Sequence, residues 1–224
     1  MGNLARRATA EAIGTALLLA AVVGSGIMGE RLAGGNVAIA LLANSIATGA
    51  ALVALILAFG PISGAHLNPF VTLCVAGQGG LPWRDTPAYV AGQLVGAALG
   101  VVTAHLMFGE PIVSASTHVR SGVPQAFSEY VATFGLVGII LGCSRARAEA
   151  VPLAVGAYIT AAYWFTASTS FANPAVTLAR AMTGTFAGIR AVDVPAFLAA
   201  QLLGALSAAL LFRWLAPADF GERA

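Results

Sequence analysis

The chain has 224 residues, of which 58% are hydrophobic and 9% are charged, and its formal net charge is +2. A water-soluble domain carries about 25% charged residues, so this composition excludes a chain whose whole surface faces water. All basic residues are arginine and none of them form a run, which argues against nucleic acid as a partner.

Six apolar stretches are candidate membrane spans, since a bilayer core about 30 Å thick needs about 20 apolar residues. They cover residues 8–29, 36–59, 86–108, 125–144, 151–167 and 192–215. Arg6 and Arg7 precede the first stretch, and no small-residue cleavage site follows it, so we predict a span rather than a signal peptide. The sequence therefore predicts a multi-pass, all-α integral membrane protein, with residues 1–224 in a single transmembrane domain.

Two shorter segments lie between the spans and are too short to cross a bilayer alone. They are SGAHLNPFVTLCVAG at 63–77 and STSFANPAVTLARAM at 168–182. The rest of the chain also repeats: AEAIGT at 10–15 matches SEYVAT at 128–133, and AYVAGQLVGAALG at 88–100 matches AFLAAQLLGALSA at 196–208. Halves of about 1–120 and 121–224 thus share a plan of three spans each, and an odd number of spans makes the second half an inverted repeat.

The arginines test the orientation of this repeat. With both termini in the cytoplasm, the cytoplasmic arginines are Arg6, Arg7, Arg84, Arg145, Arg147, Arg213 and Arg223, and the external ones are Arg31, Arg120, Arg180 and Arg190. Seven against four is a modest bias in the direction of the positive-inside rule. We therefore expect both termini in the cytoplasm.

The two short segments each contain an Asn-Pro pair that is typical of a helix start. Asparagine caps free backbone amides with its side-chain oxygen, and proline is favoured at the first helical position. Asn68-Pro69 and Asn173-Pro174 therefore predict two half-helices, each about ten residues or 15 Å long. Two such half-helices meeting end to end would cross about 30 Å, which is one bilayer core.

Such an arrangement predicts a narrow polar pathway. Both helix N-termini, each equivalent to about +0.5 charge, would point at the midplane, where two amide groups would keep free N–H donors. The irregular segments Ser63–Leu67 and Ser168–Ala172 would supply backbone carbonyls, which are tolerated at membrane depth when they line a wet cavity. We expect passive passage of small neutral molecules, with cations repelled.

Enzyme chemistry is not indicated by the remaining residues. Three histidines and two cysteines are scattered through the chain and make neither a nucleophile–base set nor a metal cluster. Cys74 and Cys143 have no metal-ligand spacing, so we expect neither a metal nor another cofactor. A coupled transporter is not indicated either, because it would normally need a buried titratable group in the pathway.

The paired Asn-Pro motifs, the SGAHLNP sequence and the AEAIGT that opens the first half resemble the aquaporin (major intrinsic protein) family over essentially the whole chain. The resemblance implies an aquaporin fold of six transmembrane helices plus two re-entrant half-helices, with one pore per protomer in a homotetramer. It also implies that Glu11 and Glu129 brace the carbonyl-bearing loops, and that His66 lines the pore or braces the first loop. A buried carboxylate in a membrane normally needs such a partner.

The chain departs from the family pattern at two positions. The first motif reads Asn68-Pro69-Phe70, and the phenylalanine either repacks a helix contact or narrows the pore. The second motif, Asn173-Pro174-Ala175, is intact, but Val176 stands where family members usually have the arginine of the selectivity filter. Arg180, one turn later, could face the outer vestibule.

Spacing from the motifs places the other filter positions. They are Thr48, Ala161 and Ser170, with Thr160 or Ala162 as alternatives to Ala161 if the register slips by one residue. Together with Val176, they predict a wide constriction lined by small side chains, without an aromatic ring or a charge.

Bacterial aquaporins of arsenic-resistance operons similarly lack the filter arginine. The resemblance implies a bacterial cytoplasmic membrane channel for arsenite, antimonite and other metalloid hydroxides, and for glycerol-sized solutes and water. An ordinary water or glycerol facilitator is the alternative, and a gated ion channel is a second one.

Overall fold

The computed structural model describes residues 3–215, and all regular secondary structure in that range is helical. The long helices are α1 (Leu4–Leu32), α2 (Val37–Ser63), α4 (Thr86–Phe108), α5 (Val123–Ala146), α6 (Val151–Phe165) and α8 (Val194–Leu215). Two short helices, α3 (Pro69–Gly77) and α7 (Pro174–Arg180), lie between them, and single 3-10 turns at Trp83–Asp85, Ala148–Ala150 and Ala191–Asp193 precede α4, α6 and α8. Arg223, which the sequence places in the cytoplasm, lies outside the described residues.

Five of the described helices are long and apolar enough to cross a membrane: α1, α2, α4, α5 and α8. The remaining long helix, α6, has 15 residues, which is shorter than the predicted span at 151–167. It ends at Phe165 because the chain leaves the helical conformation at Thr166, whose backbone is extended. The half-helices are also shorter than the ten residues predicted, with nine in α3 and seven in α7.

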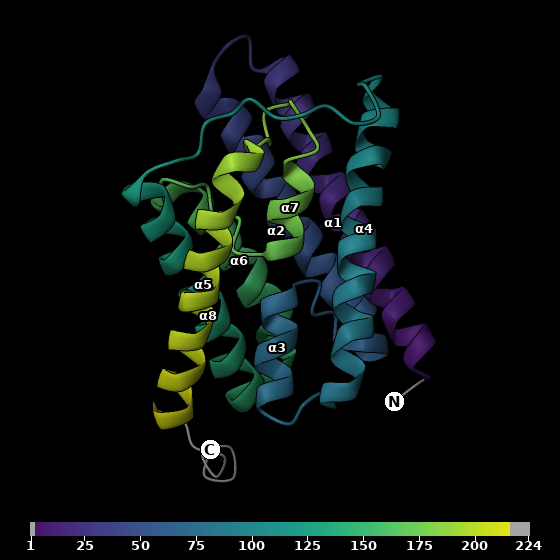
Figure 1. Cartoon of the computed structure of the whole chain (residues 1–224), viewed down its shortest axis with the longest axis vertical. Helices are drawn as coiled ribbons and strands as arrows, with labels where there is room; N and C mark the ends of the chain where they lie inside the picture. The colour runs from purple at the N-terminus through teal and green to yellow at the C-terminus, as the bar shows by residue number, and fades with distance from the viewer. Residues whose placement is uncertain (1–2, 216–224) are drawn as a thin grey trace.

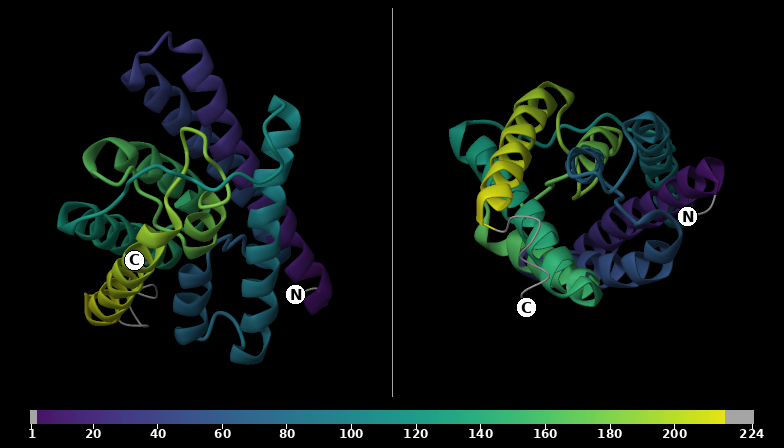
Figure 2. Two further views of the ribbon diagram at one scale, coloured as in Figure 1. Left: turned by 45° about the horizontal axis from the view of Figure 1, so that its top comes forward. Right: turned by 90° about the horizontal axis from the view of Figure 1, so that it is seen from below.

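The two half-helices lie one above the other in the middle of the molecule, with α7 above α3 (Figure 1). The start of α1 and the end of α8 lie at the same end of the molecule, as expected when each half of an inverted repeat has three spans (Figure 1). Seen from below, α3 is viewed nearly end-on, with α8 on one side and α4 on the other (Figure 2, right).

Small residues let the long helices approach closely. A Cβ added to Gly96 of α4 would collide with the backbone carbonyl of Ala12 in α1, and one added to Gly204 of α8 would collide with the carbonyl of Tyr130 in α5. The two contacts occupy corresponding positions in the two halves of the chain. Close backbone approach at small residues is how membrane helices pack without a hydrophobic driving force.

The outward faces of these helices are strongly apolar. Large side chains are exposed along the bundle, including Leu17 at 49%, Leu57 at 57%, Val95 at 59% and Leu210 at 68%. Apolar exposure on this scale marks an interaction surface rather than a face in contact with water. Together with the five apolar spans, it identifies the chain as an integral membrane protein.

Candidate pore

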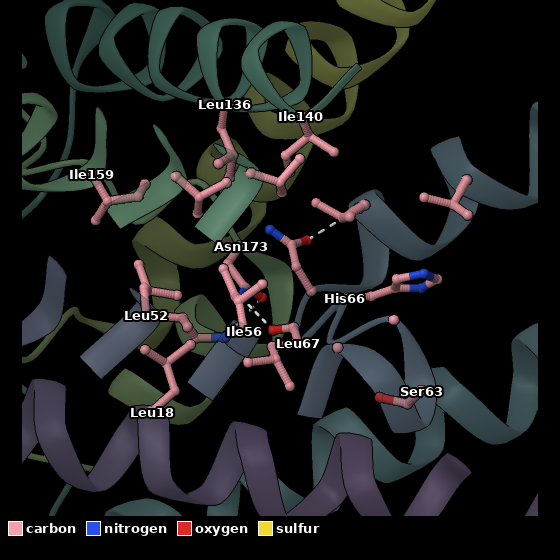
Figure 3. A pocket seen from close by; sticks show the side chains of 18 of the residues that line it. Leu18, Leu52, Ile56, Ser63, His66, Leu67, Leu136, Ile140, Ile159 and Asn173 are labelled. Carbon is pink, nitrogen blue, oxygen red and sulfur yellow. Dashed lines mark hydrogen bonds between the residues drawn. The ribbon is translucent and has the colours of Figure 1, made fainter. Parts of the chain in front are cut away.

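A cavity of about 370 Å³ runs past the point where the two half-helices meet. Its lining extends from Leu81 and Ser144 near one end of the bundle to Phe171 and Arg180 near the other. The close-up shows Asn173 beside Leu67, within a ring of apolar side chains (Figure 3). The labelled members of that ring are Leu18, Leu52, Ile56, Leu136, Ile140 and Ile159.

An asparagine caps each half-helix at the cavity wall. The side-chain oxygen of Asn68 accepts hydrogen bonds from the amides of Phe70 and Val71 at 2.9 and 3.4 Å. Asn173 caps α7 in the same way, accepting from the second and third residues after it. Both asparagines have extended backbone, and a proline follows each, so the two helices begin as the sequence predicts.

The two asparagines also bond across the meeting point. Asn68 Nδ2 donates to the carbonyl of Ala172 at 2.8 Å, and Asn173 Nδ2 donates to the carbonyl of Leu67 at 2.8 Å. The sequence predicts free N–H groups on both amides, whereas in the structure one N–H of each amide bonds to the opposite loop. One N–H of each amide is left for the cavity, since a primary amide has two donors.

The loop before each half-helix is held in a strained conformation. Ala65, Leu67, Thr169, Ser170 and Ala172 all have φ between 46° and 61°, in the left-handed region that side chains disfavour. Strain of this kind costs about 1–3 kcal/mol per residue and persists only where surrounding contacts enforce it.

A buried carboxylate supplies those contacts in each half. Glu11 accepts from the backbone amides of His66 and Leu67 at 3.0 and 2.7 Å, and from the hydroxyl of Ser63 at 2.6 Å. Glu129 accepts from the amides of Phe171 and Ala172 at 2.9 and 2.8 Å. Both glutamates are fully buried.

In each half, a glutamine and a threonine connect the buried carboxylate to the half-helix by hydrogen bonds. Gln93 Nε2 donates to Glu11 at 2.7 Å and to Thr72 Oγ1 at 2.9 Å, and the pair Gln201 and Thr177 repeats this beside Glu129. None of these four residues is predicted from the sequence, although both glutamines lie in the repeated segments at 88–100 and 196–208. A polar side chain at the same place in two apolar repeats was the available signal.

His66 lies on the cavity wall in the first loop. Its Nδ1 is 3.2 Å from Thr72 Oγ1, and its ring centroid is 5.3 Å from that of Tyr89. The side chain therefore lines the cavity and also contacts residues that support the loop.

Three of the four predicted filter residues line the cavity: Thr48, Ser170 and Val176. Ala161 does not, and the prediction is wrong at that position. Ala161 is exposed and lies about 200° around α6 from Ile159, which does line the cavity. The inward side of α6 at this level presents Tyr163, whose hydroxyl is 3.2 Å from Thr48 Oγ1. The alternatives Thr160 and Ala162 are likewise absent from the lining.

Two arginines, Arg120 and Arg180, lie at the end of the molecule where α7 ends, the end at which the sequence offers Arg180 as a residue of the outer vestibule. Arg180 lines the cavity, is 2% exposed, and donates from Nε to the carbonyl of Ala187. Arg120 donates to the carbonyls of Ser168 and Gly188 at 3.1 and 2.8 Å. Burial lowers the pKa of Arg120, which lies in the loop between α4 and α5.

Phe70 does not line the cavity. It packs against a buried cluster that includes Ala205 and Ala208 of α8, and it contributes to a separate groove of about 320 Å³ between α3 and α8. Of the two interpretations of this residue, the structure matches local repacking of a helix contact. Cys74 lines the same groove. Within residues 3–215, no group of three or more His, Cys, Asp or Glu side chains lies close enough together to hold a metal ion.

Comparison with known proteins gives consistent results. The family model described as major intrinsic protein matches residues 2–161 and 143–223. The chain is 58% identical to "Aquaglyceroporin AqpS" of Rhizobium meliloti (strain 1021) over 213 residues, covering 95% of this chain and 91% of that protein. It is 32% identical to "Aquaporin NIP6-1" of Arabidopsis thaliana over 211 residues, covering 91% and 67%. The structure of the aquaglyceroporin from Plasmodium falciparum superposes with a TM-score of 0.77 at 20% identity, covering 99% and 100% of the two chains.

Proposed function

Because the chain belongs to the major intrinsic protein family, and is thus a channel rather than an enzyme, we propose that it conducts small uncharged solutes passively through the cavity described above. The solutes are water and molecules of the size of glycerol. The observation that carries this proposal is the meeting of two capped helix N-termini, Asn68 and Asn173, at the wall of one continuous cavity.

The polar groups at this meeting point suit neutral molecules. A hydroxyl-bearing solute can accept from the remaining N–H of each asparagine while the opposite wall, with Leu52 and Ile159, offers it no partner. The positive ends of α3 and α7 disfavour cations and hydronium there. In this proposal Glu11 and Glu129 brace the loops, and Pro69, Pro174 and Ala175 start the half-helices.

We further propose the setting in which the channel works. Residues 1–224 form one channel domain in the cytoplasmic membrane of a bacterium, with both termini in the cytoplasm, as the arginine distribution indicates. Four copies form a homotetramer with one pore in each protomer, as the family resemblance implies. The lipid bilayer contacts the outward apolar faces.

The solute class we favour includes metalloid hydroxides. Arsenite and antimonite are neutral trihydroxides near pH 7, and their size and hydrogen-bonding capacity are similar to those of glycerol. The small side chains of Thr48, Ser170 and Val176 supply hydroxyl groups and an apolar wall to such a solute. A facilitator of water and glycerol alone is the second candidate, and the name of the 58% identical relative supports glycerol-sized cargo.

Vesicle uptake measurements test this proposal. Vesicles containing the protein are expected to take up arsenite and glycerol faster than empty vesicles of the same lipid, with water flux measured on the same preparation by stopped-flow light scattering. If arsenite uptake equals that of empty vesicles while glycerol uptake is rapid, metalloid transport is excluded and the second candidate, a facilitator of water and glycerol alone, is supported. Ionic currents in planar bilayers would contradict a neutral-solute channel.

The substitution Val176→Arg tests whether Val176 lies in the constriction. A guanidinium group at this position is expected to suppress arsenite and glycerol flux while water flux is retained, because it narrows the path. Val192→Arg is the matched control, since it adds the same charge at a position that is 73% exposed and outside the cavity lining. Glycerol flux that is unchanged in Val176→Arg would place Val176 outside the constriction.

A further inference from the structure

Arg180 lies on the same side of α7 as Val176. Residues four apart in a helix share one face, and both side chains line the cavity. The Cα–Cβ bonds of a helix tilt toward its N-terminus, so a long side chain at position 180 extends back toward position 176. The contact of its guanidinium group agrees with this direction: Cζ lies 3.4 Å from the ring centroid of Phe171, in the loop that precedes α7.

The guanidinium group of Arg180 keeps unused donors. Its Nε is bonded to the carbonyl of Ala187, but among residues 3–215 the two terminal nitrogens have no hydrogen-bond partner and no carboxylate within 4.0 Å. Arg120 stacks on the same phenylalanine ring, 5.0 Å from its centroid, and it also has no ion pair within the described residues. Two cationic groups that form no ion pair within residues 3–215 therefore flank Phe171.

A second unpartnered group faces the same space. The hydroxyl of Ser170 is buried without a hydrogen-bond partner in the described part of the chain, and the residue lines the cavity at 3% exposure. Tyr163 and Thr48 place two more hydroxyls on the cavity wall, 3.2 Å from each other. Leaving a buried hydroxyl unpaired is costly, so a site of this kind is complete only when a polar molecule occupies it.

Resting on the proposed channel function, we infer that Arg180 supplies the cationic donor of the outer constriction, in place of an arginine at position 176, and forms with Ser170 a binding subsite for neutral polyhydroxy solutes. The solute accepts from the terminal nitrogens of Arg180 and exchanges hydrogen bonds with the hydroxyl of Ser170. At position 176, one helical turn closer to the midplane, the small apolar side chain of Val176 leaves the passage wider than an arginine would. Arg180 meanwhile retains a positive charge at the outer constriction.

This arrangement accounts for two properties at once. A positive charge at the wall of a narrow path in a low-dielectric surrounding repels cations before they reach the midplane. The same group donates hydrogen bonds to an uncharged solute, which pays no comparable electrostatic cost. The channel therefore excludes cations although the filter position carries valine.

The test compares charge-removing and charge-retaining variants in the same vesicles. Arg180→Gln is expected to raise the leak of Na⁺ and H⁺ by about tenfold or more, because a unit charge beside the path is removed. Arg180→Lys is expected to keep cations out. Arg31→Gln is the matched control, since Arg31 is half-exposed, is paired with Glu110 and does not line the cavity.

The solute subsite has its own measurement. Ser170→Ala is expected to lower glycerol flux relative to water flux by about two- to tenfold, the value of one hydrogen bond. Arg180→Gln is expected to lower the same ratio, and Arg31→Gln to leave it unchanged.

Three outcomes would overturn the inference. Arg180→Gln with an unchanged cation leak and an unchanged glycerol-to-water ratio would show that the charge plays no part. Equal loss of all fluxes in both the Gln and Lys variants would show that Arg180 acts only structurally, by holding the loop through its hydrogen bond to Ala187. A glycerol-to-water ratio unaltered in Ser170→Ala would remove the subsite. Unmodified protein that passes no neutral solute would instead refute the proposed function.

Discussion

Glu129→Gln tests how much of the structure depends on a single buried carboxylate. The two oxygens of Glu129 accept from the amides of Phe171 and Ala172, and Gln201 Nε2 donates to the same carboxylate at 2.6 Å. Every group that points at this carboxylate is a donor. An amide side chain whose oxygen takes the place of Oε2 still accepts from Ala172 and Gln201, but its NH₂ group then faces the backbone amide of Phe171 donor to donor.

The magnitude follows from these contacts. A hydrogen bond to a charged group contributes about 1.5–3 kcal/mol, and a buried backbone N–H left unpaired costs about 1–3 kcal/mol. Loss of one such bond gives a destabilisation of about 3 kcal/mol. For a chain of this size that corresponds to a fall in Tm of about 6–12 °C. Water flux is expected to fall as well, because the carbonyl of Ala172 is the acceptor for Asn68.

The assay is thermal unfolding of purified protein in detergent, followed by water flux in vesicles. Glu149→Gln is the matched control, since it makes the same chemical change at an exposed carboxylate in the turn before α6. A Tm for Glu129→Gln within about 2 °C of the control, with equal water flux, would refute the argument that the carboxylate holds the strained loop.

Two further predictions concern packing away from the cavity. Gly96→Leu is expected to prevent the close approach of α4 to α1 and to abolish monodisperse protein on size-exclusion chromatography, whereas Gly60→Ala, with open space around its Cβ, is expected to leave the elution profile unchanged. A monodisperse Gly96→Leu protein would contradict the packing described here. Phe70→Ala is expected to lower Tm through lost contacts with α8 while the glycerol-to-water flux ratio stays constant, and a changed ratio would show that this ring shapes the pore.

The backbone of the site was largely predictable from local chemistry. Asn-Pro pairs identify both half-helix starts because capping and the fixed φ of proline act within a few residues. The repeated position of Glu11 and Glu129 likewise indicates a shared role before any contact is known.

The cavity wall was harder to predict, for two physical reasons. Counting back from Asn173 to α6 assumes a particular path for residues 166–173, and a displacement of two residues moves the chosen side chain to the opposite side of the helix. The count therefore gives Ala161, whereas Tyr163 is the residue of α6 that lines the cavity at this level. The direction of Arg180 depends on Phe171 and Ala187, contacts that helical periodicity does not encode.

The paired bonds from Asn68 to Ala172 and from Asn173 to Leu67 have a consequence for biogenesis. Until the second half has been made, the Asn68 amide and the Leu67 carbonyl lack these two partners. Neither half can reach its final shape on its own, so maturation has to wait for the last helices to insert. A truncated chain would therefore be recognised as unfinished by membrane quality control, whereas two separately translated halves could still complete each other.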